Sequence, residues 1–197
     1  VSRRVYVRSE FTWIKLSGQD VPDAGTGRRN RNLSFFSNNY ELNVVGIANL
    51  IPHRGKFYQR SNFNLYAFIG VGGLYFNPKT TLDGKVYALQ PLQTEGVRYS
   101  RFAFVIPYGL GGKAKLTPFL NLGIELGWRK TFTDYLDDVS TVHLDPASIS
   151  NPITRRLADR RPEVNEPVAA PGTKRGDPKD KDAYMLLSMR LEYYLPV

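Results

Sequence analysis

Six stretches of this chain alternate apolar and polar side chains with a period of two. They cover residues 5–13, 37–50, 64–72, 102–111, 119–132 and 185–193. In the clearest one, 119–132, Leu122, Ile124 and Leu126 fall on one face while Glu125 and Arg129 fall on the other. None of the six has a helical period, so the sequence predicts an all-β fold built from antiparallel strands.

The apolar face of such strands can turn toward an internal core or toward lipid, and charges on the opposite face do not separate the two cases. Strand length does. Strands of ~10 residues or more cross the hydrocarbon at a tilt, whereas strands of soluble sheets are usually nearer ~5 or 6 residues long. We therefore expect a single domain over residues 1–197, a small transmembrane β-barrel with about six recognisable strands.

The connections between these stretches alternate in length. Residues 17–34, 77–100 and 134–182 are long, whereas 52–62 and 112–118 are shorter. Outer-membrane barrels have long extracellular loops and short periplasmic turns, so the long connections are expected outside the cell. Within the last of them, residues 146–182 are rich in Pro, Arg, Lys and Asp, which predicts a long, mobile extracellular loop.

Aromatic residues gather toward the ends of the strands, as in the interfacial belts of membrane proteins. Ordinary core packing is the alternative interpretation of these residues. The candidates are Trp13, Tyr75, Phe76, Trp128, Phe132, Tyr193 and Tyr194.

The charge and composition of the chain limit the kinds of molecule that it is expected to bind. The 27 Lys and Arg against 18 Asp and Glu give a formal charge of +9, which indicates an anionic neighbour such as nucleic acid, phospholipid or lipopolysaccharide phosphate. The basic clusters lack interleaved aromatic residues, so nucleic acid is not expected. The absence of cysteine excludes disulfides, thiolate metal sites and cysteine nucleophiles. No apolar stretch reaches the ~20 residues of a membrane-spanning helix.

Several linear motifs carry a resemblance to a known family. They are Arg31-Asn-Leu-Ser-Phe35, Tyr75-Phe-Asn-Pro78, Asp83-Gly84, Leu89-Gln-Pro-Leu92, Thr94-Glu-Gly96 and, most specifically, Thr131-Phe-Thr-Asp-Tyr-Leu-Asp-Asp-Val-Ser140. With these motifs the chain resembles the outer-membrane β-barrel family to which PorG belongs, over residues 5–145 and again in the final strand.

This resemblance implies an eight-stranded outer-membrane barrel of the Bacteroidetes type IX secretion system, a protein-transport machine. It implies a non-enzymatic component that anchors or couples the periplasmic ring of PorK and PorN to the outer membrane. The family carries a signal peptide and about two strands before the point where this sequence opens, at Val1-Ser-Arg-Arg. We therefore expect this chain to lack N-terminal strands. A small passive or ligand-binding barrel without a secretion role is the alternative.

The polar faces of the strands predict the contents of the barrel. An eight-stranded barrel is just wide enough for side chains to fill it, so a charge-balanced set should pair internally as a plug. The expected lumen residues are Arg8, Glu10, Glu41, Glu125, Arg129, Arg190 and Glu192.

The two shorter connections are basic and contain no acidic residue. If they are periplasmic, they are positioned to contact an acidic surface of the ring. Anchoring to anionic headgroups is the alternative interpretation. The expected partner-binding residues are His53, Arg54, Lys56, Arg60, Lys113 and Lys115.

The most specific motif lies where the last long loop begins. Its polar residues are expected to order the root of the loop through side-chain-to-backbone hydrogen bonds. They are Asp134, Tyr135, Asp137, Asp138 and Ser140. Two other interpretations are a Ca²⁺ site at the aspartates and a hydrolase triad with His143. Neither has diagnostic spacing, so the sequence predicts no catalytic residue, metal or cofactor.

Overall fold

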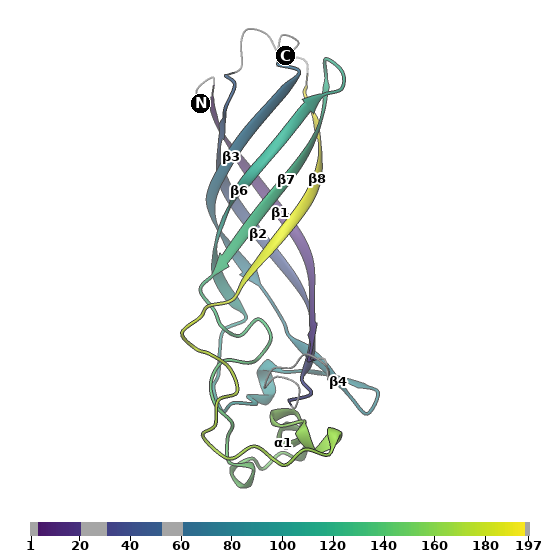
Figure 1. Ribbon diagram of the computed structural model, residues 1–197, viewed down its shortest axis with the longest axis vertical. Coiled ribbons are helices and arrows are strands. Elements are labelled where there is room, and N and C mark those ends of the chain that lie inside the picture. The colour runs from purple at the N-terminus through teal and green to yellow at the C-terminus, as the bar shows by residue number, and fades with distance from the viewer. Residues whose placement is uncertain (1–3, 21–30, 53–60, 196–197) are drawn as a thin grey trace.

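A computed structural model describes residues 4–20, 31–52 and 61–195. Across these residues the sheet contains six long strands (Figure 1). They are β1 (Val5–Gln19), β2 (Ser34–Asn49), β3 (Phe63–Tyr75), β6 (Phe102–Lys115), β7 (Leu120–Thr131) and β8 (Ala183–Tyr193). Each pairs antiparallel with the next, in the order β1-β2-β3-β6-β7-β8, and the sheet curls into a barrel-like shape. The predicted all-β, antiparallel barrel fold is confirmed.

Side chains alternate between the inside and the outside of this curled sheet. Leu122, Ile124 and Leu126 point outward on β7, whereas Glu125 and Arg129 are buried inside. The same alternation runs through all six long strands of the described chain, in the phase that the sequence predicts. Among these residues, no helix is both long and apolar enough to cross a membrane.

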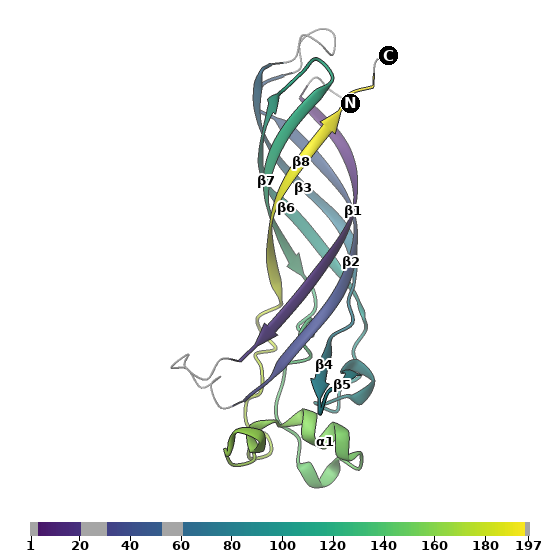
Figure 2. The same ribbon diagram turned by 90° about the vertical axis from the view of Figure 1, so that its right-hand side faces the viewer.

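The two outer strands of the sheet, β1 and β8, face each other without pairing (Figure 2). The described residues form no ladder between them. A hollow of about 310 Å³ lies between Ser9–Thr12 of β1 and 186–190 of β8. Side chains nevertheless meet across it inside the sheet, where Arg190 approaches Glu10 at 3.1 Å. We call this opening the seam.

The two ends of the sheet differ. At one end, β6 turns directly into β7, near the start of β1 and the end of β8; we call it the turn end. The end of β1, the start of β2 and the connections β3–β6 and β7–β8 lie at the other end, which we call the loop end. The β6–β7 turn spans residues 116–119, because β6 continues to Lys115. The turn predicted over 112–118 was therefore placed too early.

Two of the long loops fold against each other into a cap at the loop end. In the first, β4 (Lys79–Leu82) and β5 (Lys85–Ala88) form a hairpin whose turn, Asp83-Gly84, has φ of 50° and 75°. Positive φ at both turn residues is the type I′ arrangement that favours Asp-Gly. A short helix, η2 (Gln90–Leu92), follows.

The second loop carries η3 (Pro146–Ser148), α1 (Pro152–Ala158) and η4 (Arg161–Val164). Asn151 caps α1 by accepting hydrogen bonds from the amides of Ile153 and Thr154, and Pro152 begins the helix. Leu157 of α1 packs on Leu82 and Leu89 of the first loop. The segment over 146–182 therefore contains short helices, and its apolar contacts join it to the first loop, whereas its expected mobility stays a prediction.

Two further apolar clusters fill the inside of the sheet. Val45, Ile47, Tyr66 and Phe68 pack within the barrel. A second cluster of Leu74, Phe76, Tyr99, Val105 and Leu136 closes its loop-end mouth. The strands therefore enclose apolar layers as well as polar groups.

Candidate functional site: lumen, cap and turn end

The middle of the lumen is occupied by an ionic cluster. Glu125 accepts hydrogen bonds from Arg8 at 2.9 Å, from Arg190 at 3.0 Å and from the Tyr66 hydroxyl at 2.9 Å. Arg190 also bonds Glu10 at 3.1 Å. Such pairs hold long side chains in fixed positions inside a narrow barrel.

The cluster continues toward the loop end through Arg129. Its Nε donates to Glu41 at 2.8 Å, and one guanidinium nitrogen lies 3.7 Å from Glu10. Glu41 accepts further hydrogen bonds from Asn43 and from the hydroxyl of Tyr184. All seven expected lumen residues point inward, and six of them belong to this cluster. Two lumen tyrosines, Tyr66 and Tyr184, were not predicted, although their inward phase is visible in the alternation.

Glu192, the seventh lumen residue, pairs nearer the turn end with Lys113 at 3.0 Å. The Lys113 side chain is only 5% exposed and lies over the rings of Tyr6 and Tyr66. Lys113 was predicted as a partner-binding residue on a turn, and that placement is wrong. It occupies the same inward phase as Gly109 and Gly111, because β6 continues past it.

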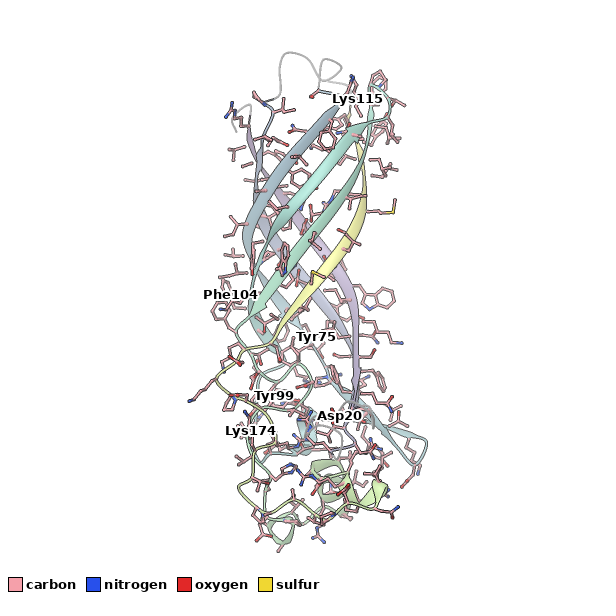
Figure 3. All side chains as sticks on the ribbon, viewed as in Figure 1. Asp20, Tyr75, Tyr99, Phe104, Lys115 and Lys174 are labelled. Carbon is pink, nitrogen blue, oxygen red and sulfur yellow. The ribbon has the colours of Figure 1, made fainter. Side chains whose placement is uncertain are left out.

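Of the other predicted partner-binding residues, the structure describes only Lys115. Lys115 ends β6 at the turn end (Figure 3). His53, Arg54, Lys56 and Arg60 lie outside the described residues.

The predicted loop-ordering motif forms part of the interior of the cap. Asp138 accepts hydrogen bonds from Thr94 at 2.5 Å and from the Tyr99 hydroxyl at 2.6 Å. Tyr99 in turn stacks on Tyr135, with ring centroids 4.4 Å apart. These contacts join the first loop to the root of the second.

A buried ion pair between Glu95 and Arg175 also joins the first loop to the second. Glu95 accepts from Arg175 at 2.8 Å and from the backbone amides of Ser140 and Thr141 at 3.0 and 2.9 Å. Arg175 also donates to the carbonyl of Asp138 at 2.7 Å. Neither Glu95 nor Arg175 was predicted as a site residue, although Glu95 lies in the recognised Thr94-Glu-Gly96 motif.

The other two aspartates of the motif, Asp134 and Asp137, interact electrostatically with Asp182, which lies where the last loop leads into β8. Asp182 accepts from the amide of Leu136 at 2.9 Å, and Asp137 accepts from that of Val139 at 3.0 Å. Burial and the neighbouring Asp182 charge raise the pKa of Asp137 to about 7. Burial, together with Asp134, raises the pKa of Asp182 to about 6. Burial also raises the pKa of Asp134.

This geometry supports neither alternative interpretation of the motif. Among the described residues, no three His, Cys, Asp or Glu side chains are placed to hold a metal ion. The oxygens of Asp138 are directed at Thr94 and Tyr99, and His143 Nε2 lies 3.4 Å from Arg161. Burial lowers the pKa of His143 to about 4. Ser140, His143 and Asp138 therefore do not form a triad.

Rings on the outer face form a continuous series near the loop end. Phe11, Tyr40, Tyr75 and Phe102 lie on successive strands, with neighbouring centroids 6.3, 6.5 and 5.0 Å apart. Tyr75 and Phe104 mark this level in Figure 3, between the strands and the cap.

Five of the predicted belt candidates are in outward phase on the strands or just beyond them: Trp13, Tyr75, Trp128, Phe132 and Tyr193. Phe76 instead belongs to the buried mouth cluster. The Tyr194 hydroxyl lies 3.4 Å from Glu192, on the inward side.

Comparison with known proteins gives one match. No curated protein and no solved structure matches this chain. A family model described as a domain of unknown function, DUF6089, matches residues 1–147, which cover well over half of the chain. The chain therefore belongs to the DUF6089 family.

Proposed function

We propose that this chain is a non-enzymatic outer-membrane β-barrel of the type IX protein secretion system, which couples a periplasmic ring of the PorK and PorN type to the outer membrane. The membrane location is supported by the outer surface of the sheet. The secretion role is supported by the resemblance of the motifs, above all Thr131–Ser140, to the family to which PorG belongs.

The observation that carries the membrane location is the composition of the outer face. Among the outward side chains of the six long strands, only Lys15 and Lys130 are charged. Phe11, Leu187 and Met189 are each more than 70% exposed. Soluble proteins rarely present so large a continuous apolar surface, whereas a lipid-facing barrel requires one.

The strand lengths agree with a bilayer. The shortest long strand, β8, has 11 residues. At ~3.3 Å per residue and a tilt of ~40°, such a strand rises roughly 28 Å, which covers the apolar band of about 25 Å in outer-membrane barrels. The series of rings from Phe11 to Phe102 lies where an interfacial belt is expected. At the turn end, Phe119 and Tyr193 provide the second belt, with centroids 6.4 Å apart.

Closure of the barrel requires further strands at the seam. Strand edges that face lipid leave backbone groups without hydrogen bonds, at a cost of several kcal/mol per group. Because β1 and β8 run in opposite directions, an even number of added strands keeps every pairing antiparallel. Two strands would complete an eight-stranded barrel and cover the hollow beside Glu10 and Arg190.

The filled lumen supports a coupling role over a conduit. The cluster around Glu125 and Arg129 occupies the middle of the barrel, and Phe76 and its neighbours close the mouth. Contact with a periplasmic ring would then fall on the turn end, where Lys115 lies. The basic sequences of the two shorter connections favour an acidic partner surface.

The loop end favours contact with lipopolysaccharide. Lys15 and Lys130 are exposed beside the ring series, and the outer faces of the described long strands carry no acidic residue. In the proposed orientation these two cations would lie at the level of the phosphates of the outer leaflet.

The secretion role is tested by deleting the gene and measuring export of secreted proteins, followed by recovery of the tagged protein from detergent-solubilised outer membranes. Loss of export and co-purification of ring proteins are the expected results. Unchanged export, with a correctly inserted barrel that brings down no ring protein, would favour the alternative of a ligand-binding barrel.

A further inference from the structure

The seam leaves one arginine of the lumen open to the outside of the sheet. Arg190 lies on β8 between Met189 and Leu191, whose side chains point outward. Its own side chain is 25% exposed, whereas its partners Glu10 and Glu125 are 9% and 3% exposed. A guanidinium open to hydrocarbon is unfavourable, so in the proposed membrane location the seam requires a cover.

The guanidinium of Arg190 uses only one of its nitrogens. Nη2 donates both hydrogen bonds, to Glu10 at 3.1 Å and to Glu125 at 3.0 Å. Within the described part of the chain, Nε and Nη1 donate none, and Nε is buried. Arg190 also lines the hollow of about 310 Å³ at the seam. An acceptor that enters this hollow can therefore reach the exposed side of the guanidinium.

The backbone edges at the seam call for strands as the cover. Among the described residues, β1 pairs along one edge with β2, and β8 pairs along one edge with β7. Their other edges present amides and carbonyls that lipid cannot satisfy. Because β1 and β8 run in opposite directions, an even number of strands is needed, and a β-hairpin is the smallest such unit.

The contact between Arg190 and Glu10 limits the width of the gap. Extended Arg and Glu side chains reach roughly 7 and 5 Å from Cα, so a contact of 3.1 Å keeps the two Cα atoms within roughly 15 Å of each other. Two strands inserted into an antiparallel sheet create three spacings of ~4.8 Å, or roughly 14 Å. The gap therefore has room for one hairpin, and not for four strands.

The position of β1 favours a hairpin of the same polypeptide over one from another chain. β1 begins at the turn end, where residues 116–119 alone join β6 to β7. A hairpin that leads into β1 needs only a turn of this kind to lie along the free edge of β1. Its other strand then lies along β8, and no association with a second chain is required.

We propose that a β-hairpin of the same polypeptide, leading into β1, closes the seam and that one of its inward side chains accepts a hydrogen bond from Arg190. This proposal rests on the membrane location proposed above. The described ionic cluster is already balanced, with Arg8, Arg129 and Arg190 against Glu10, Glu41 and Glu125. An uncharged side-chain oxygen, from Asn, Gln, Ser or Thr, therefore fits better than a further carboxylate.

The occupant is identified by photo-cross-linking in outer membranes that contain the full-length protein. p-Benzoylphenylalanine replaces Ser9, which lies beside the hollow, and cross-linked peptides are sequenced from cells with mixed isotope labels. We expect an intramolecular cross-link to a segment that precedes β1. The control position is Leu110, which lies between Ala67 of β3 and Leu126 of β7 and should react only with these strands or lipid. A cross-link from Ser9 to β8, to a segment after β8, to a second copy or to another protein would overturn the proposal, as would no cross-link when the control reacts.

The contact with Arg190 is tested by a double-mutant cycle on the full-length protein. Arg190→Gln and alanine at the inward hairpin residue nearest Arg190 should each lower the unfolding temperature, and together by clearly less than the two separate shifts. Arg190→Lys replaces Arg190→Gln if the latter fails to insert. The control cycle pairs the same alanine with Lys113→Met, whose partner is Glu192, and should be additive. Additive shifts with Arg190 would rule out the contact. Neither test measures export, so failure of the hairpin and failure of the secretion role are distinguished.

Discussion

The Arg175 guanidinium donates a 2.8 Å hydrogen bond to Glu95, and this ion pair joins two loops whose residues are 80 positions apart. Both side chains are 2% exposed. The carboxylate also holds the backbone at Ser140 and Thr141, so the pair fixes the root of the last loop to the first. The cap is therefore held together largely by charge-assisted hydrogen bonds between segments distant in sequence.

Replacing Glu95 by Gln should destabilise the cap by about 3 to 5 kcal/mol, because it leaves the Arg175 charge buried without a counter-charge. Limited proteolysis should then cleave within 133–182 while the strands stay protected. Arg156→Gln, which breaks the exposed pair with Asp83, is the control and should leave cleavage unchanged. If the cap of the Glu95→Gln variant resists protease as well as the cap of the original chain does, this account is wrong.

The cap should lose stability as pH rises toward neutrality. The folded pKa values of Asp137 and Asp182, about 7 and about 6, lie above the ordinary value of 3.8. The folded cap therefore binds more protons than the unfolded one between these limits, and its stability falls between about pH 4 and pH 7. Hydrogen exchange of the cap amides at pH 5 and pH 8, corrected for intrinsic rates, measures this change. Asp137→Asn should flatten the dependence, and a slope identical to that of the original chain would rule out Asp137 as its source.

Single cysteines should show whether lipid covers the outer face of β7. The chain contains no cysteine, so each introduced thiol is unique. In intact membranes, cysteines at Leu122, Ile124 and Leu126 should resist a water-soluble maleimide, because lipid covers them. Partial reaction at solvent-accessible Lys115→Cys serves as the positive control. Strong labelling at all three β7 positions would contradict the membrane assignment.

Replacing Lys113 should lower the stability of the barrel without changing the recovery of ring proteins. Lys113→Met removes the partner of Glu192, which keeps a 3.2 Å hydrogen bond from Asn121 and is 20% exposed. We expect a loss of about 2 to 3 kcal/mol, below the range for fully buried pairs. A lower unfolding temperature on semi-native gels would show it. Recovery of ring proteins should stay normal with Lys113→Met but fall with Arg54→Glu/Lys56→Glu, and the reverse pattern would move the contact away from the turn end.

The period-two pattern by itself determined the fold class and the face of each strand residue. Because successive side chains on a strand point to opposite sides, parity alone decides whether Leu122 faces outward and Glu125 inward. The same alternation, continued along β6, also predicts that Lys113 faces the lumen. That position was missed because the predicted strand ended at residue 111, whereas β6 continues to Lys115 and pairs with β7 along this whole stretch.

Only the tertiary structure decided which loops meet and which charges share a space. The contact between Glu95 and Arg175, and the approach of Asp137 to Asp182, join segments whose separation in the chain is set by loops of irregular conformation. No periodicity links such positions, since the path of an irregular loop depends on the apolar contacts it finds, such as Leu157 on Leu82 and Leu89. The strands were thus specified by local alternation, whereas the cap results from long-range packing.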